Sequence, residues 1–430
     1  MKTITGILIA LQLLTNATAQ RLCGSEAYTA EISRTNPAAL NGYREAEAQI
    51  IKTLGKSGLK RRDTAANEII YIPVVVHVLY KTAAQNISDA QILSQLESLN
   101  KDFAYQNEDK SNTPKAFRSV AADVKIKFCL AQVAPDGKRT NGIIRKYTNT
   151  EVFSADDAMK YALNGGSTAW NSRQYLNIWV CNLGGRSLGY ATQPGGPANL
   201  DGIVIAFDAF GTIGNLRPSF NKGRTATHEV GHWLGLKHIW GDTDCGDDGV
   251  EDTPRQKSYN YGCPSFPRVT TCSENENGDM FMNYMDFSDD ACMNMFTEGQ
   301  KQRMRALFAT GNLRNSFLTS FACDSNLVQA GPIAAPVDTT VTPAPVAPVA
   351  AEQTKVYPNP VQNEVVIECK NASKQDVKQM AVFSITGNKV FTAVLDKEKT
   401  RFNFSFLKAG IYVVKIGEGK NVTVTKLVKQ

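Results

Sequence analysis

The sequence predicts two domains of different class, a mixed α/β (α+β) domain followed by a separate all-β sandwich. In the first part of the chain, buried strand-like runs alternate with amphipathic helical stretches. A proline-rich stretch without Lys or Arg at 326–350 predicts an extended linker. Beyond it, short alternating strands recur at regular spacing, which is typical of a small β-sandwich. We therefore place the first domain at 62–325 and the sandwich at 351–430.

Two segments precede the first domain. Residues 1–19 predict a secretory signal peptide, with a lysine, an apolar stretch over 7–14 and a small-residue cleavage site. The apolar stretch is too short to span a membrane, and no later segment offers the ~18 continuous apolar residues of a transmembrane helix. Residues 20–61 favour helix and close near Lys60-Arg61-Arg62, and we interpret them as a pro-segment.

Composition argues for a globular protein that does not bind nucleic acid. At 430 residues, with 42% hydrophobic and 20% charged residues, the chain is long enough for two or more globular domains. Its net charge of +6 is spread thinly, without a long basic block. We therefore expect no nucleic-acid partner.

The first domain is expected to mix strands and helices along its length. In chain order we expect a strand over 70–79, a helix over 89–103 with Ser88 as N-cap, strands over 124–133, 175–183 and 202–207, and helices over 224–236 and 297–308. Cys129 and Cys181 lie in apolar strand-like runs, so we expect both to be buried thiols.

Three of the four histidines lie within eleven residues, and their spacing suits zinc. On a helix, His228 and His232 project from one face about one turn apart, where both can bind one Zn²⁺. Gly235 can end the helix and let His238 arrive as a third ligand, with a fourth position left for water. Glu229 then lies beside the metal, where it can take a proton from that water. The alternative, a chance cluster of surface histidines, explains less of this spacing.

These residues form the extended motif of the metzincin metallopeptidases, which the chain resembles. The segment Met282 to Phe296 is similar to the pappalysin family in particular. The resemblance implies that Met285 forms the methionine turn beneath the zinc, although an ordinary core methionine is an alternative. Phe287 departs from the family pattern, which has a tyrosine there whose hydroxyl supports the oxyanion. We expect activity that is weakened by this loss.

The resemblance also implies features around the zinc site. The strand over 201–207 would be an open edge that pairs with a peptide, or else simply a core strand. Four cysteines between the third histidine and the methionine turn allow three pairings by spacing alone. The family favours Cys245–Cys272 and Cys263–Cys292.

An acidic loop follows the third histidine. Its clustered carboxylates suit Ca²⁺, and the family implies binding through Asp248, Thr253 and the carbonyl of Val250. A solvated acidic loop without an ion is the alternative.

Cys23 suggests how the enzyme is kept latent. The thiolate of an early unpaired cysteine can occupy the open zinc position until its segment is removed, as in the cysteine switch of pappalysin relatives. The alternative is a leftover cysteine without a role.

Asp290 suggests a preference for cationic substrates. It matches an acidic pocket residue of relatives that cut before Lys or Arg, although it could instead be a turn residue. With this preference, cleavage at Lys60-Arg61-Arg62 would release Cys23, so we expect self-activation.

The last domain resembles the C-terminal sorting domain of type IX secretion substrates from Bacteroidetes. The resemblance rests on Tyr357-Pro358-Asn359-Pro360, an Ile-Thr-Gly turn at 385–387 and the strand 410–416. A carbohydrate-binding or adhesive module is the alternative. The chain is thus expected to be a secreted or cell-surface zinc endopeptidase acting on proteins and peptides and exported by the type IX machinery. A non-catalytic secreted binding module that retains the zinc fold is the competing class.

Overall fold

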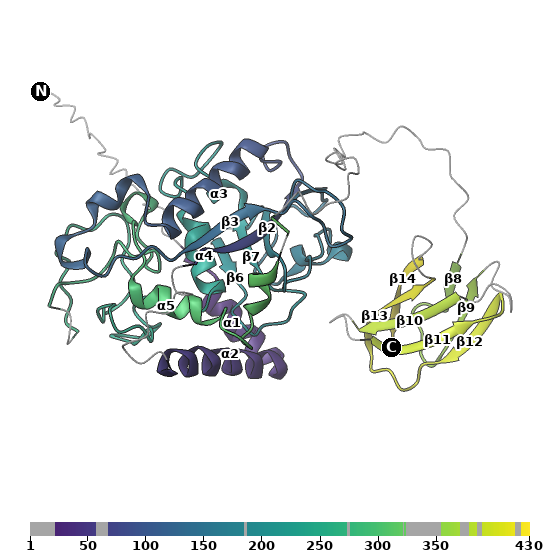
Figure 1. Cartoon of the computed structure of the whole chain (residues 1–430). Helices are drawn as coiled ribbons and strands as arrows, with labels where there is room; N and C mark the ends of the chain where they lie inside the picture. The colour runs from purple at the N-terminus through teal and green to yellow at the C-terminus, as the bar shows by residue number, and fades with distance from the viewer. Residues whose placement is uncertain are drawn as a thin grey trace, which may run out of the picture. The chain divides into compact units, whose positions relative to one another are not determined.

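The computed structural model divides the chain into two compact units, 1–340 and 341–430, which are described separately (Figure 1). The structure describes residues 22–56, 68–184, 187–272, 276–320, 322–323, 354–369, 378–384, 389–417 and 423–430. The expected signal peptide, the Lys60-Arg61-Arg62 segment and the linker 326–350 lie outside these residues.

A largely parallel sheet forms the centre of the first unit. Among the described residues, its strand order is β1-β6-β7-β5-β2-β3, and β4 also pairs with β2. The strands are β1 (Leu22–Cys23), β2 (Ile70–Tyr80), β3 (Ile126–Leu130), β4 (Ile143–Tyr147), β5 (Leu176–Cys181), β6 (Ser187–Ala191) and β7 (Ile203–Ala206). β2 is long enough to pair with β3 along its first half and with β4 along its second half. Its Val- and Ile-rich sequence is buried on both faces, as expected of a parallel sheet covered on two sides.

Helices α3 (Asp89–Phe103) and α4 (Arg224–Trp233) contact each other and belong with one face of the sheet. The α3 helix matches the predicted range, and the side chain of Ser88 caps it by accepting from the amide of Gln91 at 3.1 Å. Because side chains alternate along a strand, Ile178 and Val180 join the core on this face, whereas Trp179 joins a second core on the other.

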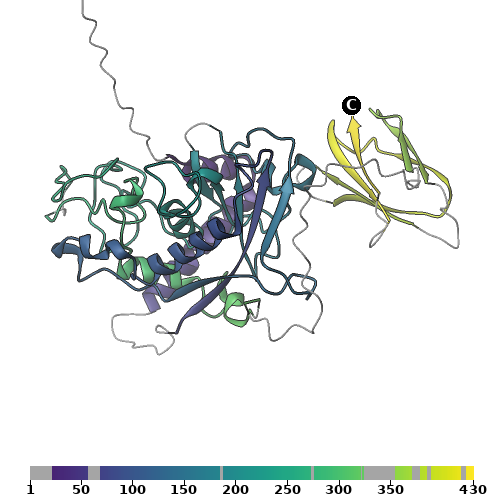
Figure 2. The same cartoon turned by 90° about the horizontal axis from the view of Figure 1, so that it is seen from above.

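Two helices of the expected pro-segment lie on one side of the first unit. They are α1 (Ser25–Thr35) and α2 (Pro37–Lys56), drawn in purple on the opposite side from α3 in Figure 1. In the view from above, α3 is in front of them (Figure 2). α2 contacts α5 (Glu298–Ala306), where Glu47 pairs with Arg303. The segment is therefore packed against the peptidase unit.

The edge of the sheet differs from the expectation. The strand predicted over 201–207 appears as β7, which lies between β5 and β6 and is fully buried, so it is a core strand and not an open edge. The strand beyond it is β6, which pairs with β1 of the pro-segment. β6 was not predicted because Ser187-Leu188-Gly189-Tyr190-Ala191 contains a glycine and lacks a regular apolar alternation.

One cysteine prediction was wrong. Cys129 is not a thiol but is bonded to Cys323, 194 residues away, with their Cα atoms 6.1 Å apart. The last described residues of the first unit return to this side of the sheet, where the carbonyl of Ala322 accepts from the amide of Gln132 at 2.7 Å. Cys181 is a buried thiol, as expected. The structure also joins Cys245 to Cys272 and Cys263 to Cys292, the two pairs that the family resemblance implies.

The second unit is all-β. Its two sheets have the orders β11-β10-β13-β14 and β12-β9-β8 among the described residues. The strands are β8 (Thr354–Tyr357), β9 (Glu364–Cys369), β10 (Lys378–Ser384), β11 (Lys389–Leu395), β12 (Lys399–Asn403), β13 (Gly410–Ile416) and β14 (Thr423–Lys429). Val365, Val382 and Val414, from both sheets, are fully buried in one core. This agrees with the predicted β-sandwich.

Candidate active site

Helix α4 brings the first two histidines together. His228 and His232, four residues apart, are both buried, and their Nε2 atoms lie 3.1 Å apart. The helix ends earlier than predicted, at Trp233, and Gly235 follows with a φ of 84°. This left-handed conformation reverses the chain, as expected of a glycine just past a helix end. His238 then returns to the site, with its Nε2 atom 3.1 Å from that of His232.

Each of the three imidazoles is oriented by a hydrogen bond from its Nδ1 atom. His228 donates to the carbonyl of Tyr284 at 2.7 Å, and His232 donates to the carbonyl of Leu236 at 2.9 Å. His238 donates to the carboxylate of Asp242. Burial, followed by the neighbouring His238, lowers the pKa of His232 to about 3, so this ring is neutral. With Nδ1 protonated, the Nε2 lone pairs of the rings converge on one point.

This donor set fits a zinc ion. Bonds of ~2.0–2.1 Å in tetrahedral geometry separate two nitrogen ligands by about 3.3 Å, close to the observed separations. Three converging lone pairs repel one another unless a cation lies between them. The Sγ atom of Cys23 completes the group, whose four ligand atoms all lie within 4.8 Å of one another. Three imidazoles and one thiol are ligands that zinc prefers.

Glu229 lies beside this group and contacts the pro-segment. It is buried, and its Oε2 atom accepts from the hydroxyl of Ser25 at 2.8 Å. The thiol of Cys23 also lies 3.6 Å from Oε2. Burial and the charge of Glu229 raise the pKa of Cys23 well above its usual value. The hydroxyl of Ser25 also accepts from the amide of Ala191 at 2.8 Å, which ties it to β6.

Met285 and Phe287 lie against the histidine cluster. Met285 is fully buried, and a Cβ atom on Gly231 would lie 2.5 Å from its sulfur, so any larger residue there would force the Met285 side chain to shift. The ring of Phe287 lies 4.9 Å from that of His238 and 5.8 Å from that of His228, measured between centroids. A tyrosine at this position would therefore place its hydroxyl on a ring that packs on two of the three imidazoles.

Asp290 lies at the start of α4. It is fully buried, and its Oδ2 atom accepts from the amides of Lys222 at 2.9 Å and Arg224 at 3.2 Å. A carboxylate at this end of a helix is stabilised by the unpaired amides and the helix dipole. With the pro-segment present, Asp290 therefore caps the start of α4.

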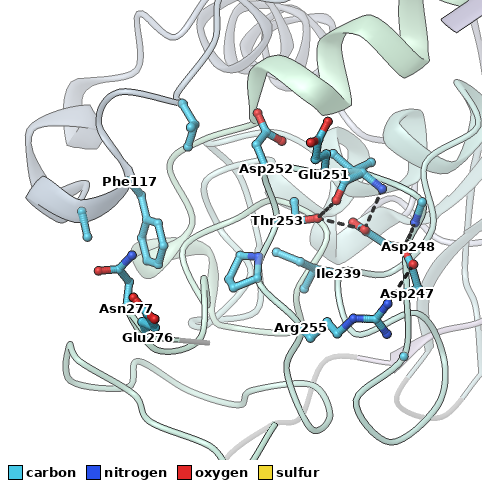
Figure 3. Close-up of a pocket in the computed structure, with 16 residues that line it drawn as sticks. Phe117, Ile239, Asp247, Asp248, Glu251, Asp252, Thr253, Arg255, Glu276 and Asn277 are labelled. Carbon is cyan, nitrogen blue, oxygen red and sulfur yellow. Dashed lines mark hydrogen bonds and ion pairs between the residues drawn. The ribbon is translucent and has the colours of Figure 1, made fainter. Parts of the chain in front are cut away.

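The acidic loop after His238 opens into a cavity of about 730 Å³ (Figure 3). The Oδ1 atom of Asp248 accepts from the hydroxyl of Thr253 at 2.8 Å and from the amide of Val250 at 3.1 Å. Its Oδ2 atom and Oδ1 of Asp252 are buried and have no hydrogen-bond partner among the described residues. Burial raises the pKa of Asp248 to about 7. An unpaired buried carboxylate oxygen of this kind is costly unless a cation is bound.

Comparisons with known proteins identify the family of the chain. Residues 160–309 match the peptidase family described as pregnancy-associated plasma protein-A, and 355–430 match the secretion system C-terminal sorting domain. An extracellular metalloprotease of Pyricularia oryzae is 32% identical over 67% of this chain and 88% of its own. One of Colletotrichum graminicola is 33% identical over 69% and 93%.

Solved structures of mirolysin are also similar. A promirolysin mutant of Tannerella forsythia is 47% identical with a TM-score of 0.65, covering 72% of this chain and all of its own. Mature mirolysin in complex with a cleaved peptide is 51% identical with a TM-score of 0.59, covering 61% and 99%. The fold and the site thus define a metallopeptidase of mixed α/β, metzincin-like fold. The chain belongs to the pappalysin family of extracellular metallopeptidases.

Family membership settles several expectations. The chain is a secreted metallopeptidase with a propeptide-like N-terminal part, and its family implies a catalytic zinc. Its sorting domain places it among proteins exported by Bacteroidetes to the cell surface or beyond. No helix among the described residues is long and apolar enough to cross a membrane.

Sequence reasoning missed three residues at or beside the site. Asp242 could have been found, because it follows a predicted ligand by four residues and carries a carboxylate suited to orient an imidazole. Ser25 and Tyr28 gave no such signal. Their contacts depend on how the pro-segment folds over β6, which local spacing does not reveal.

Proposed function

We propose that the chain is a zinc endopeptidase made as a latent precursor, with His228, His232 and His238 as zinc ligands and Glu229 as general base. One observation carries the proposal. The three imidazoles are oriented through Nδ1, and their Nε2 atoms converge beside the buried carboxylate of Glu229. This carboxylate does not belong to the group of ligand atoms. A purely structural site gains nothing from that carboxylate.

Glu229 and its surroundings account for the reaction steps. When bound, zinc acidifies a water molecule and polarises the scissile carbonyl. Glu229 takes the proton of the attacking water and passes it to the leaving amine. The Nδ1 hydrogen bonds to Tyr284, Leu236 and Asp242 hold the three imidazoles in the tautomer that binds metal through Nε2. Without a tyrosine at 287, oxyanion stabilisation depends on the metal and on backbone groups.

Replacing Glu229 with Gln tests this assignment. We expect the variant, matured by added wild-type enzyme that is then removed, to bind zinc as wild type does, by metal analysis. It should lose casein cleavage by on the order of 10³-fold or more, as expected when a general base is lost from a preserved site. Glu108→Gln is a matched control, because the side chain of Glu108 is 93% exposed. A Glu229→Gln enzyme that cleaves casein in a chelator-sensitive way would disprove the role.

The pro-segment contacts support a cysteine switch at Cys23. Its sulfur lies within 4.8 Å of the ligand atoms of the three histidines. With zinc bound, it would take the position that water needs for catalysis. The hydroxyl of Ser25 meanwhile occupies the general base. β1 also pairs with β6, so it covers a sheet edge that a peptide could use. The latent chain would thus have its metal position, its base and its substrate strand occupied together.

We infer a preference for Lys or Arg just after the scissile bond, through Asp290. The supporting observation is its place at the amino-terminal end of the helix that carries His228, where its Oδ2 atom accepts from two backbone amides. Cleavage at Lys60-Arg61-Arg62 would then release the pro-segment. Amino-terminal sequencing of the matured protein tests this, and a new terminus far from 60–62 would exclude self-activation there.

Calcium binding at the acidic loop is the second metal proposal. The free Oδ2 atom of Asp248, the hydroxyl of Thr253 and the carbonyl of Val250 are oxygen ligands of the kind Ca²⁺ takes. Adding Ca²⁺ to chelator-treated protein should raise Tm by several degrees, and Asp248→Asn should remove most of that rise. Asp136→Asn, at an exposed turn, serves as the control. An equal rise in all three proteins would disprove the site.

The runner-up is a secreted binding or adhesion module with weak or no catalysis. Phe287 favours it, since a decayed enzyme would lose such a hydroxyl. Chelator-sensitive cleavage of gelatin or casein distinguishes the two. In either case the sorting domain implies recognition by the type IX secretion machinery.

A further inference from the structure

Tyr28 of the pro-segment fills a slot in the peptidase unit. Its side chain is 3% exposed, and its hydroxyl donates to Oδ2 of Asp157 at 2.7 Å. Its ring packs on that of Tyr190, with centroids 4.7 Å apart, and the ammonium of Lys160 lies 5.2 Å from its centre. Burial and the charge of Asp157 raise the pKa of Tyr28 far above its usual value, so it stays a hydrogen-bond donor.

The slot is built from buried charged groups that have no part in the zinc site. Oδ1 of Asp157 accepts from Lys160 at 2.8 Å and from the hydroxyl of Tyr190 at 3.0 Å. Lys160 also donates to the carbonyl of Leu200 at 2.7 Å. Asp157 adopts a φ of 63°, a left-handed conformation that is strained for a non-glycine residue. One carboxylate oxygen of Asp157 is thus held by the enzyme's own groups, and the other accepts from the phenol of Tyr28.

The slot lies one step along β6 from the reaction site. A Cβ atom on Gly189 would lie 3.1 Å from Cγ of Glu229, so this residue backs the general base. Tyr190 follows it and points to the opposite face of the sheet, where it packs with Trp179. A peptide strand added beside β6 presents alternate side chains to the two faces, and a residue opposite Tyr190 shares its face. Such a residue reaches the slot while its neighbour faces Glu229.

The direction of the peptide places this residue before the scissile bond. Asp290 lies at the amino-terminal end of α4, whereas Pro194, just after β6, packs beside Gly235 at the other end of the helix. A substrate whose Lys or Arg turns toward Asp290 after the cut therefore runs antiparallel to β6. The pro-segment strand β1 runs parallel to it, which is the reverse direction. The amino-terminal side of the substrate then passes Tyr190.

We propose that the mature enzyme uses the slot vacated by Tyr28 to bind a tyrosine side chain of the substrate, within three residues before the scissile bond. Asp157 accepts the hydrogen bond from the phenol, and Tyr190 and Lys160 contact its ring. The proposal rests on the peptidase function only for the position of the cut, since binding in the slot needs no catalysis.

Peptides with one cleavable bond before Lys test the slot. Tyr, Phe or Ala is placed at each of the three preceding positions, and affinity is measured by anisotropy on Glu229→Gln protein whose pro-segment has been removed by wild-type enzyme. At one position we expect Tyr to bind about tenfold more tightly than Phe, because its hydroxyl gains a hydrogen bond to a charged group. Ala should be weaker than both. Ratios within twofold at all three positions overturn the proposal.

A matched pair of variants assigns the preference to Asp157. Asn tolerates the left-handed conformation, so Asp157→Asn should reduce the Tyr-to-Phe ratio toward one. Asp156→Asn, next to it but exposed, should keep the tenfold ratio. If Asp157→Asn does not fold, the wild-type ratios still decide. Retained discrimination without hydrolysis by the wild-type enzyme would refute the peptidase function alone, whereas hydrolysis before Lys without discrimination would refute the slot alone.

Discussion

At the scale of single residues, we expect the side chains around the three imidazoles to set the reaction rate and the zinc affinity of the site. Phe287 packs on His238 and His228 and also stacks on Tyr259, with ring centroids 5.3 Å apart. Its neighbourhood is aromatic and largely buried, so the ring position is well defined. What this residue lacks is a donor for the oxyanion. In the proposed mechanism, we therefore expect the cost to fall on the reaction and not on the fold.

Phe287→Tyr should raise kcat of the mature enzyme by about tenfold or more, since one oxyanion donor contributes on the order of 10²-fold. Zinc content and Tm should stay unchanged. Tyr259→Phe is the companion variant, because its ring adjoins Phe287 and is 41% exposed. If Tyr259→Phe lowers kcat while Phe287→Tyr does nothing, the hydroxyl is already supplied by Tyr259 and the prediction is wrong.

Asp242 is a positioning residue for His238. Its carboxylate accepts the Nδ1 hydrogen bond and so selects the tautomer with a free Nε2 lone pair. Asp242→Ala should weaken zinc binding about 10–100-fold, measured by competition with a chromogenic chelator. Asp244→Ala, on the same loop, should bind zinc as wild type does. Equal zinc affinity in both variants would show that the contact does not matter.

At the scale of elements, local signals were predictable and long-range ones were not. The range of α3 was predicted correctly because Ser88 caps it and its apolar residues recur at helical spacing. The three histidines of the proposed zinc site could be grouped from the sequence because their spacing is fixed by one helix and one glycine turn. β6 and the Cys129–Cys323 bond were missed, since each depends on chain segments that meet only in the fold. The contact of Ser25 with Glu229 spans 204 residues and was missed for the same reason.

Ser25→Ala should loosen the latent form. The change removes the hydroxyl from Glu229 and leaves the amide of Ala191 without its partner in a buried place. Such a loss costs about 1–3 kcal/mol, so the precursor should mature roughly tenfold faster or more. Maturation is followed by gel and by cleavage of a fluorogenic peptide. Thr35→Ala, exposed at the end of α1, should mature at the wild-type rate. An unchanged rate in Ser25→Ala would show that the contact of Ser25 with Glu229 does not hold the precursor latent.

At the scale of the whole molecule, two units with separate cores divide the work. The peptidase core gathers around the parallel sheet, and the sorting domain has its own core between two antiparallel sheets. Because each unit buries its apolar side chains by itself, neither needs the other to fold. Catalysis and export should therefore be separable by truncation between the units.

A chain ending at residue 340 should keep its peptidase activity and lose its export. Its peptidase unit retains the proposed zinc ligands and the three disulfides found among the described residues. In the native host, fractionation should find this protein in the periplasm and not at the cell surface, because the sorting domain is missing. After maturation in vitro, kcat/KM on a Lys-containing peptide should match the full chain within about twofold, as expected for independent domains. Normal surface delivery of the truncated chain would show that export depends on the peptidase unit instead.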